Sequence, residues 1–141
     1  MPLVKIWIHF IWTTKNREKL IDKNLRPKLI SHIKDNSKSK EIYIDRINCL
    51  QEHIHLLVSL NKEHSVSKVM NLIKGESSFW INKNKLSKVK FEWQDEYIAI
   101  SVSESVLPKV RKYIDNQEEH HRVKSLRKSI NYLFKNMALK S

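Results

Sequence analysis

The feature that most constrains the fold is the order in which apolar runs and amphipathic segments follow one another along the chain. Four runs are rich in Ile, Val and aromatic residues, which strands favour. They cover residues 4–13, 41–50, 53–60 and 97–102, and residues 51 and 52 can turn the chain between the second and third runs.

Three other segments carry apolar side chains at helical spacing. The first covers residues 24–36, the second follows a serine cap at position 65 or 67, and the third runs from a serine at position 103 or 105 to about residue 121. The resulting order is β-α-β-β-α-β-α. It predicts an α+β fold of the ferredoxin-like or RRM-like sandwich type, in which helices pack on one face of an antiparallel sheet.

The length of 141 residues indicates one folded domain. We expect this domain to cover residues 1–121, with its last helix near the C-terminus. Residues 122–141 contain six Lys and Arg and no Asp or Glu, and their apolar residues follow helical spacing. This segment is predicted to be a basic amphipathic helix that docks on the domain or on a second subunit.

The net charge of +12 predicts attraction to a polyanion, although a solvated lysine surface on an ordinary soluble protein has the same composition. Cys49 is the only cysteine, which excludes an intramolecular disulfide and a cysteine zinc site and suits the reducing cytoplasm. Gly75 is the only glycine, which excludes glycine-rich nucleotide loops. No run is long enough for a membrane span, and no signal peptide is recognisable.

Two histidines, His53 and His55, flank Ile54 in the third strand run. Side chains alternate between the faces of a strand, so both imidazoles lie on one face and Ile54 points into the core. Neutral imidazole is a common metal ligand, and two of them on a central strand are placed to bind one ion. The alternative is a pair of half-exposed strand histidines without a ligand.

A second group lies sixty residues later, on the last predicted helix. Tyr113 and Gln117 are four residues apart, so the phenol and the amide lie on one helix face, and His120 and His121 extend it. A phenol can act as a nucleophile, and an amide oxygen can join two imidazoles around a metal. The alternatives are a core tyrosine, a solvated glutamine and surface imidazoles.

With these residues the chain resembles the HUH single-tyrosine transposases of small insertion sequences and the related REP-associated tyrosine transposases. The resemblance extends over most of the chain. It rests on five segments in order: IHFIWTTKNR, EHIHLLVSL with the His-hydrophobic-His motif, KVMNLIKGESS, WQDEYIAISVSES and YIDNQEEHH. The Lys-rich segment after His121 departs from the pattern of many relatives, which carry acidic residues there.

The resemblance implies an RRM-like sheet and a Mg²⁺ or Mn²⁺ ion held by His53, His55 and Gln117. It implies that Tyr113 cuts single-stranded DNA, leaving a 5′-phosphotyrosine and a free 3′-OH. The substrates implied are hairpin-bearing strands at the ends of a mobile element. The resemblance also implies a homodimer in which the tyrosine of one subunit completes the metal site of the other.

Basic residues beside the matched segments are candidate phosphate contacts. They are Lys15, Arg17, Lys68 and Lys74, with His120 and His121 as further candidate DNA contacts. Three aromatic residues, Trp12, Phe91 and Trp93, either stack on unpaired bases or fill the core.

The expected function is therefore metal-dependent DNA strand transfer by a cytoplasmic transposase. One alternative is a non-catalytic RRM-like nucleic-acid-binding protein, which would need exposed aromatic residues on its sheet. A second is a domesticated relative that cuts DNA but no longer transposes, and a third is a basic dimerisation module without metal affinity.

Overall fold

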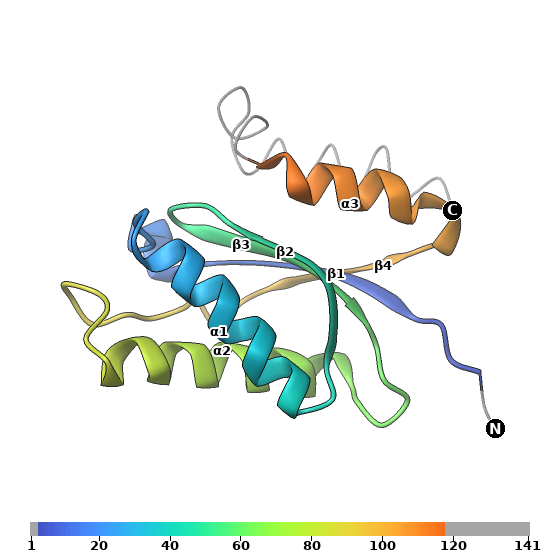
Figure 1. The fold of residues 1–141 in the computed structure, drawn as a ribbon, viewed down its shortest axis with the longest axis horizontal. Helices are drawn as coiled ribbons and strands as arrows, with labels where there is room; N and C mark the ends of the chain where they lie inside the picture. The colour runs from blue at the N-terminus through green and yellow to red at the C-terminus, as the bar shows by residue number, and fades with distance from the viewer. Residues whose placement is uncertain (1–2, 118–141) are drawn as a thin grey trace.

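The computed structural model describes residues 3–117, which form a four-stranded antiparallel sheet with helices on both faces (Figure 1). The strands are β1 (Trp7–Thr13), β2 (Tyr43–Cys49), β3 (His53–Ser59) and β4 (Ile98–Val102), and the helices are α1 (Leu25–Ser39), α2 (Val66–Lys83) and α3 (Leu107–Asp115). Short 3-10 turns, η1 (Lys15–Arg17) and η2 (Glu104–Val106), follow β1 and β4.

The strand order is β2-β3-β1-β4, with β3 and β1 in the centre, and every pair is antiparallel. This order and the βαββαβ succession confirm the predicted ferredoxin-like fold class. In the register of the central pair, Thr13 lies opposite His53 and Ile11 opposite His55. The two histidines therefore occupy the middle of the sheet, with a strand on each side.

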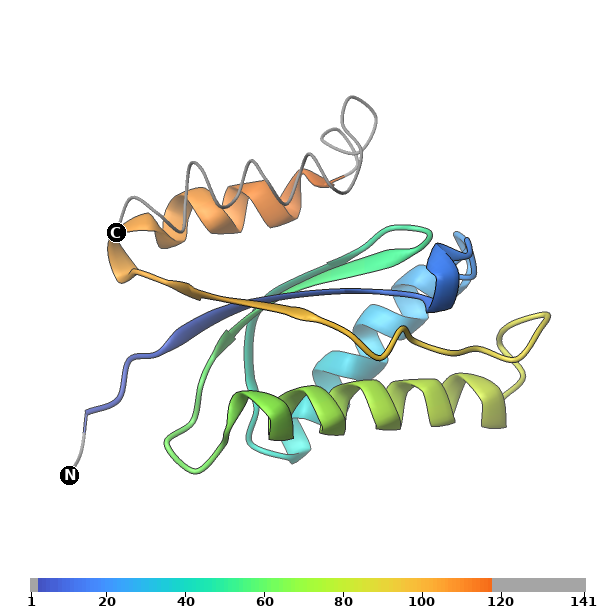
Figure 2. The same ribbon diagram turned by 180° about the vertical axis from the view of Figure 1, so that it is seen from behind.

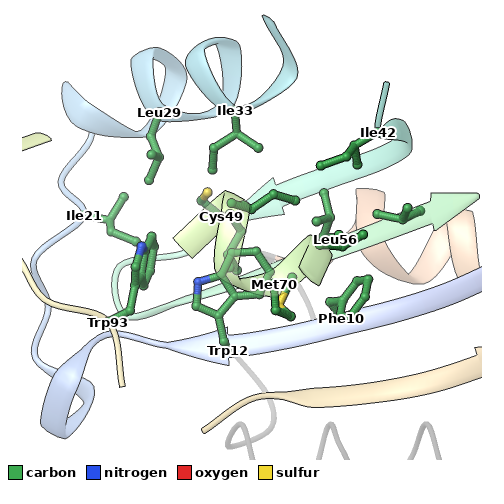
Figure 3. Close-up of a cluster of buried hydrophobic side chains, with 14 of the residues drawn as sticks. Phe10, Trp12, Ile21, Leu29, Ile33, Ile42, Cys49, Leu56, Met70 and Trp93 are labelled. Carbon is green, nitrogen blue, oxygen red and sulfur yellow. The ribbon is translucent and has the colours of Figure 1, made fainter. Parts of the chain in front are cut away.

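The main core lies between the sheet and the helices α1 and α2. Alternate residues of the central strands point to this side, among them Phe10 and Trp12 of β1 and Ile54 and Leu56 of β3, all of which are fully buried. Figure 3 shows Phe10, Trp12 and Leu56 in one cluster with Leu29 and Ile33 of α1 and Met70 of α2. The prediction that Ile54 points into the core is confirmed.

Helix α3 packs on the opposite face of the sheet, as Figures 1 and 2 show from two sides. The prediction that all helices share one face was wrong in this detail. Leu107, Val110 and Ile114 of α3 form a smaller buried cluster with Ile11 and Leu57, which point away from the main core. Because those two sheet residues are apolar, this face also needs a cover, and α3 provides it.

Local interactions set where the helices begin. The Asp22 carboxylate accepts hydrogen bonds from the backbone N–H of Asn24 and Leu25, at the start of α1. Ser65 caps α2 by accepting from the backbone N–H of Lys68, as one of the two predicted serines. The strands are shorter than predicted by up to three residues at an end, and the last helix begins at Leu107 rather than at a serine.

Two predictions fall outside the described residues: the amphipathic helix over residues 122–141 and the contacts of His120 and His121. Within residues 3–117, no helix is both long enough and apolar enough to cross a membrane.

Candidate active site

The two histidines of the motif, His53 and His55, lie side by side on the face of the sheet that α3 covers (the α3 face). Their ring centroids are 5.0 Å apart, and each residue is only 1 % exposed. The interpretation of His53 and His55 as half-exposed strand histidines is therefore wrong. Because β3 is hydrogen-bonded to β2 and to β1, the backbone that carries both imidazoles is held on each side.

His53 is oriented by the residue that precedes it. Its Nδ1 lies 2.9 Å from Oε1 of Glu52, and the Glu52 side chain is 5 % exposed. A carboxylate accepts a hydrogen bond from Nδ1–H, and in that tautomer the lone pair of the His53 ring is on Nε2. Glu52 is itself held because its backbone carbonyl accepts from the backbone N–H of Thr14 at 2.8 Å.

His55 has a different partner, His9 of β1. Nε2 of His9 lies 3.0 Å from Nδ1 of His55, and the two ring centroids are 5.2 Å apart. Burial lowers the pKa of His9 to about 3, so its imidazole is neutral at physiological pH. The α3 face of the sheet thus presents three adjacent imidazoles from two strands.

Helix α3 brings Tyr113 onto this group. The Tyr113 ring centroid is 5.8 Å from that of His55 and 6.4 Å from that of His9, in edge-on geometry. Tyr113 is 3 % exposed and belongs to the same buried cluster as Val110 and Ile114. The phenol is thus both a packed residue and a direct neighbour of the motif histidines, so its two interpretations are compatible.

Gln117 lies one turn after Tyr113 and is 1 % exposed, so it is not a solvated glutamine. Its Nε2 donates a hydrogen bond to the backbone carbonyl of Tyr113 at 2.9 Å. This bond uses the amide nitrogen, whereas a metal would bind the amide oxygen. Gln117 thus lies two residues beyond the end of α3, at a buried position.

Helix α3 is fastened to the edge strand β2 by a bidentate ion pair. Arg111 donates to the Asp45 carboxylate from Nε at 2.8 Å and from a terminal nitrogen at 2.9 Å. The strand register shifts between Ile44 and Arg46, so Asp45 is the extra residue of a bulge, and its side chain is only 6 % exposed. The hydrogen bonds that Arg111 donates to Asp45 raise the pKa of Arg111, which keeps the guanidinium charged.

Two further contacts hold the C-terminal half of α3 on the same strand. The Asn48 amide donates to the backbone carbonyl of Ile114 at 2.8 Å, next to Tyr113. Arg46 pairs with Asp115 at 3.5 Å. Together with the ion pair of Asp45, these contacts determine where α3, and hence Tyr113, lies on the sheet.

The residues of this face fit a divalent metal by the chemistry of their donor atoms. Among residues 3–117, no group of three or more His, Cys, Asp or Glu side chains is placed to hold an ion. A three-ligand site at His53 and His55 therefore needs a third donor of another residue type, and the Gln117 amide is the predicted one. Neutral imidazole is a common ligand of divalent metals, and a carbonyl oxygen suits Mn²⁺ and Mg²⁺.

The predicted DNA-contacting residues separate into two groups. Lys15 and Arg17 are exposed in η1, directly after the end of β1 that pairs with His53. Lys68 and Lys74 lie on α2, which covers the other face of the sheet. The Lys74 ammonium donates to the backbone carbonyls of Gln94 and Asp95 at 2.6 and 2.8 Å, so it also holds the segment before β4.

The three candidate stacking aromatics are core residues. Trp12 and Phe91 are 1 % exposed and Trp93 is 8 % exposed. Trp93 packs edge-on against the other two rings and donates from its indole N–H to the Ser77 hydroxyl at 2.9 Å. The interpretation of these residues as base-stacking platforms is wrong.

Comparison with known proteins gives this arrangement a family. The family described as "Transposase IS200 like" matches residues 3–117, which include His53, His55, Tyr113 and Gln117. The chain belongs to the IS200-like transposase family. The ISDra2 transposase TnpA of Deinococcus radiodurans is 22 % identical to this IS200-like transposase over 116 residues, covering 79 % of this chain and 83 % of the relative.

Solved structures share the fold. A crystal structure of a protein assigned as a transposase of Deinococcus radiodurans R1 has a TM-score of 0.67 at 21 % identity, covering 82 % of this chain and 93 % of that one. A REP-associated tyrosine transposase bound to a REP hairpin has a TM-score of 0.65 at 17 % identity, covering 86 % of this IS200-like transposase and 71 % of the relative.

Sequence reasoning missed three residues of this site. His9 is a polar residue within the apolar first strand run, and its position there gives no sign of a role. Only the pairing of β1 with β3 brings it to His55. Glu52 was assigned only to a turn, although an acid directly before a His-x-His motif is a signal for an orienting carboxylate. No sequence signal distinguishes Asp45 as the residue of a bulge.

Proposed function

We propose that this IS200-like transposase cuts single-stranded DNA with Tyr113 as the nucleophile and rejoins it to a new end. The observation that carries the proposal is the position of Tyr113, whose ring lies 5.8 Å from that of His55 on a buried face with three imidazoles. A core tyrosine needs only apolar neighbours. A tyrosine packed against a group of imidazoles that could hold a metal is placed to take part in phosphoryl transfer.

In the proposed reaction, the Tyr113 oxygen attacks a DNA phosphorus and the bond from phosphorus to the 3′ oxygen breaks. The products are a 5′-phosphotyrosine and a free 3′-OH, so the phenol loses one proton and the leaving 3′ oxygen gains one. A phenol has a pKa of about 10 and is a weak nucleophile at neutral pH. A bound Mg²⁺ or Mn²⁺ would polarise the phosphate and stabilise the developing charge.

The residues of this chain would hold and orient the groups that react. His53, His55 and Gln117 are the proposed metal ligands, and Glu52 fixes the ring of His53. The anchoring of α3 to β2 positions the phenol. Because the phosphotyrosine retains the energy of the phosphodiester, a 3′-OH can attack it and reseal the strand without a nucleotide cofactor.

The proposed substrate is a strand with a hairpin, as at the ends of a mobile element. One structural relative is bound to a REP hairpin, and the net charge of +12 favours any nucleic acid. Lys15 and Arg17 are the basic candidates beside the His53 end of the sheet. They would contact phosphates next to the site, whereas Lys68 and Lys74 would do so from α2.

We also propose that the protein is a cytoplasmic homodimer with active sites shared between subunits. In a single chain, Tyr113 already contacts the histidines of its own sheet. Sharing in trans would place α3 of one subunit on the sheet of the other, with the same contacts made between chains. A mixture of a Tyr113→Phe subunit and a His53→Ala subunit tests this, because only sharing in trans restores cleavage.

The structure disfavours a non-catalytic RRM-like binding protein. Such a protein stacks bases on aromatic residues of an exposed sheet face. Here Phe10 and Trp12 point into the core under α1 and α2, and the other face carries histidines under α3. A domesticated nuclease would have the same site, and no observation favours it over a transposase.

Binding and cleavage of defined strands test the proposed substrate. We expect tighter binding to a single-stranded hairpin than to a duplex of equal length, with affinity that falls steeply with salt. Cleavage should require Mn²⁺ or Mg²⁺ and should be lost with EDTA. Equal affinity for both DNAs, without metal-dependent cleavage, would contradict the proposal and favour a generic basic protein.

A further inference from the structure

The hydrogen bond between His9 and His55 joins two side chains that can each donate or accept. Nε2 of His9 and Nδ1 of His55 are 3.0 Å apart, and both residues are 1 % exposed. Only one proton can lie between two nitrogens at this distance. One ring must therefore donate and the other must accept, and the two assignments have opposite consequences for His55.

If His9 donates, Nδ1 of His55 is the acceptor, and a neutral His55 then carries its proton on Nε2. That nitrogen could not bind a metal. If His55 donates from Nδ1, its Nε2 carries the lone pair and can bind one. Because Nδ1 of His55 faces His9, a metal held by His55 would be bound through Nε2.

We infer that His9 is a positioning residue that accepts the Nδ1 proton of His55 and so holds the His55 ring in its metal-binding tautomer. In this assignment, His9 carries its own proton on Nδ1. The inference rests on the proposed metal site. It assigns to His9 of β1 the role that Glu52 has for His53.

The position of His9 suits this role. It lies in the middle of β1, between β3 and β4, directly opposite Leu57 on one side and Ile100 on the other. His55 lies on the neighbouring strand β3, two residues before Leu57, and is therefore the diagonal neighbour of His9. Long side chains can bridge this separation. The Tyr113 ring, 6.4 Å away, covers the pair, so His9 is packed on every side.

The two motif histidines would then differ in the hydrogen-bond partner that holds each ring in its tautomer. The partner of His53 is a carboxylate, which raises the basicity of a ligand imidazole, whereas the partner of His55 is a neutral ring. Replacing a hydrogen-bond partner of a ligand histidine typically lowers metal affinity or activity by roughly 10–100-fold. His9 should therefore matter for metal binding although it is not itself a ligand.

Tautomers in the metal-free protein test the assignment directly. In ¹⁵N-labelled protein, two-bond ¹H–¹⁵N correlation spectra distinguish the Nδ1–H from the Nε2–H form of each ring. We expect His55 in the Nδ1–H form and its Nε2 unprotonated, with His53 in the same form as an internal reference. A His55 ring protonated at Nε2 would overturn the role of His9.

Variants test the consequence for metal affinity, measured by Mn²⁺ titration with electron paramagnetic resonance. His9→Leu removes the acceptor at similar volume and should weaken Mn²⁺ binding by about 10–100-fold. His9→Gln places an amide oxygen near the same position and should recover most of the affinity. Ile100→Val, directly opposite His9, is the packing control and should bind like the parent.

The outcomes separate this inference from the proposed function. If the parent binds Mn²⁺ and His9→Leu binds it equally well, His9 has no positioning role and the metal site stands. If the parent shows the expected tautomers but binds no Mn²⁺, the proposed metal chemistry fails, and the purpose assigned to His9 fails with it. Should His9→Leu not fold, the tautomers of the parent and the rescue by His9→Gln still decide the question.

Discussion

The two faces of the central sheet differ in what they bury. The face under α1 and α2 buries a large apolar cluster that includes Phe10, Trp12, Ile54 and Leu56. The face under α3 buries a smaller apolar cluster next to His9, His53 and His55. Both faces are closed to water, but only the second encloses polar groups with the chemistry of a site.

The difference arises within single strands. In β3, Ile54 and Leu56 point to one face and His53 and His55 to the other, because the side-chain period of a strand is two. The residues that anchor the strand in the core thus alternate with the residues that would bind a metal. Substitutions on the two faces should therefore separate loss of folding from loss of chemistry.

The largest effect on stability is expected on the apolar face. Phe10→Ala removes a fully buried ring from the centre of β1 and should lower the free energy of unfolding by about 3–5 kcal/mol. Urea unfolding monitored by circular dichroism measures the change. Phe79→Ala is the control, because Phe79 is 64 % exposed, and should change stability little. Similar losses in both variants would contradict the assignment of the core.

On the α3 face, the main effect is expected on activity. His53→Ala and His55→Ala should abolish Mn²⁺-dependent cleavage but keep the fold and most of the DNA affinity, because the proposed phosphate contacts lie elsewhere. Gln117→Ala should weaken cleavage without abolishing it, since water can replace a neutral ligand. Cleavage assays and DNA binding are compared on the same preparations. Unchanged cleavage in either histidine variant would exclude that histidine from the mechanism.

A smaller effect is expected where α3 is anchored to β2. Asp45→Asn removes the carboxylate charge that pairs with Arg111, so the position of α3 and Tyr113 on the sheet should be less well fixed. Cleavage should therefore fall more than DNA binding does. Asp115→Asn is the matched control, because its contact with Arg46 is longer, at 3.5 Å, and Asp115 is about half exposed. If the two variants lose cleavage to the same extent, the ion pair of Asp45 has no special positioning role.

The smallest effect is expected at the surface. Changing Lys15 and Arg17 together to Gln should make the salt dependence of single-strand binding less steep by about 1.4 in log–log slope, at about 0.7 per phosphate contact. Lys68→Gln on α2 should change it by less, since that helix covers the other face. Titrations at several salt concentrations measure the slopes. A larger change of slope in Lys68→Gln than in the Lys15 and Arg17 variant would indicate that DNA binds on the face covered by α2.

Sequence alone predicts the parts of this molecule that depend on neighbouring residues along the chain. Alternation predicts the strands, and four-residue spacing places Tyr113 and Gln117 on one face. The face that α3 covers depends on Ile11 and Leu57, which read as ordinary strand residues until the register is known. The contact between His9 and His55 likewise depends on the alignment of two strands 46 residues apart.

The boundaries of the elements and the bulge were not predictable for a related reason. The shift at Asp45 leaves that residue outside the ladder, and its partner Arg111 lies 66 residues later on a helix. No local pattern encodes such a pair, because its stability comes from tertiary contacts. The candidate site residues could be named from residue types and spacing, but the residues that orient them could be found only from the fold.

The central claim is that Tyr113 is the nucleophile. Tyr113→Phe removes one oxygen and keeps the packed ring, so the α3 face should stay closed while the reaction stops. The decisive measurement incubates the protein with a 3′-labelled hairpin strand and Mn²⁺ and maps the covalent adduct by peptide mass. We predict an adduct on Tyr113 that survives denaturing gels and is absent from Tyr113→Phe. An adduct on Tyr43, Tyr97 or Tyr132, or efficient cleavage by Tyr113→Phe with water as the nucleophile, would contradict the account.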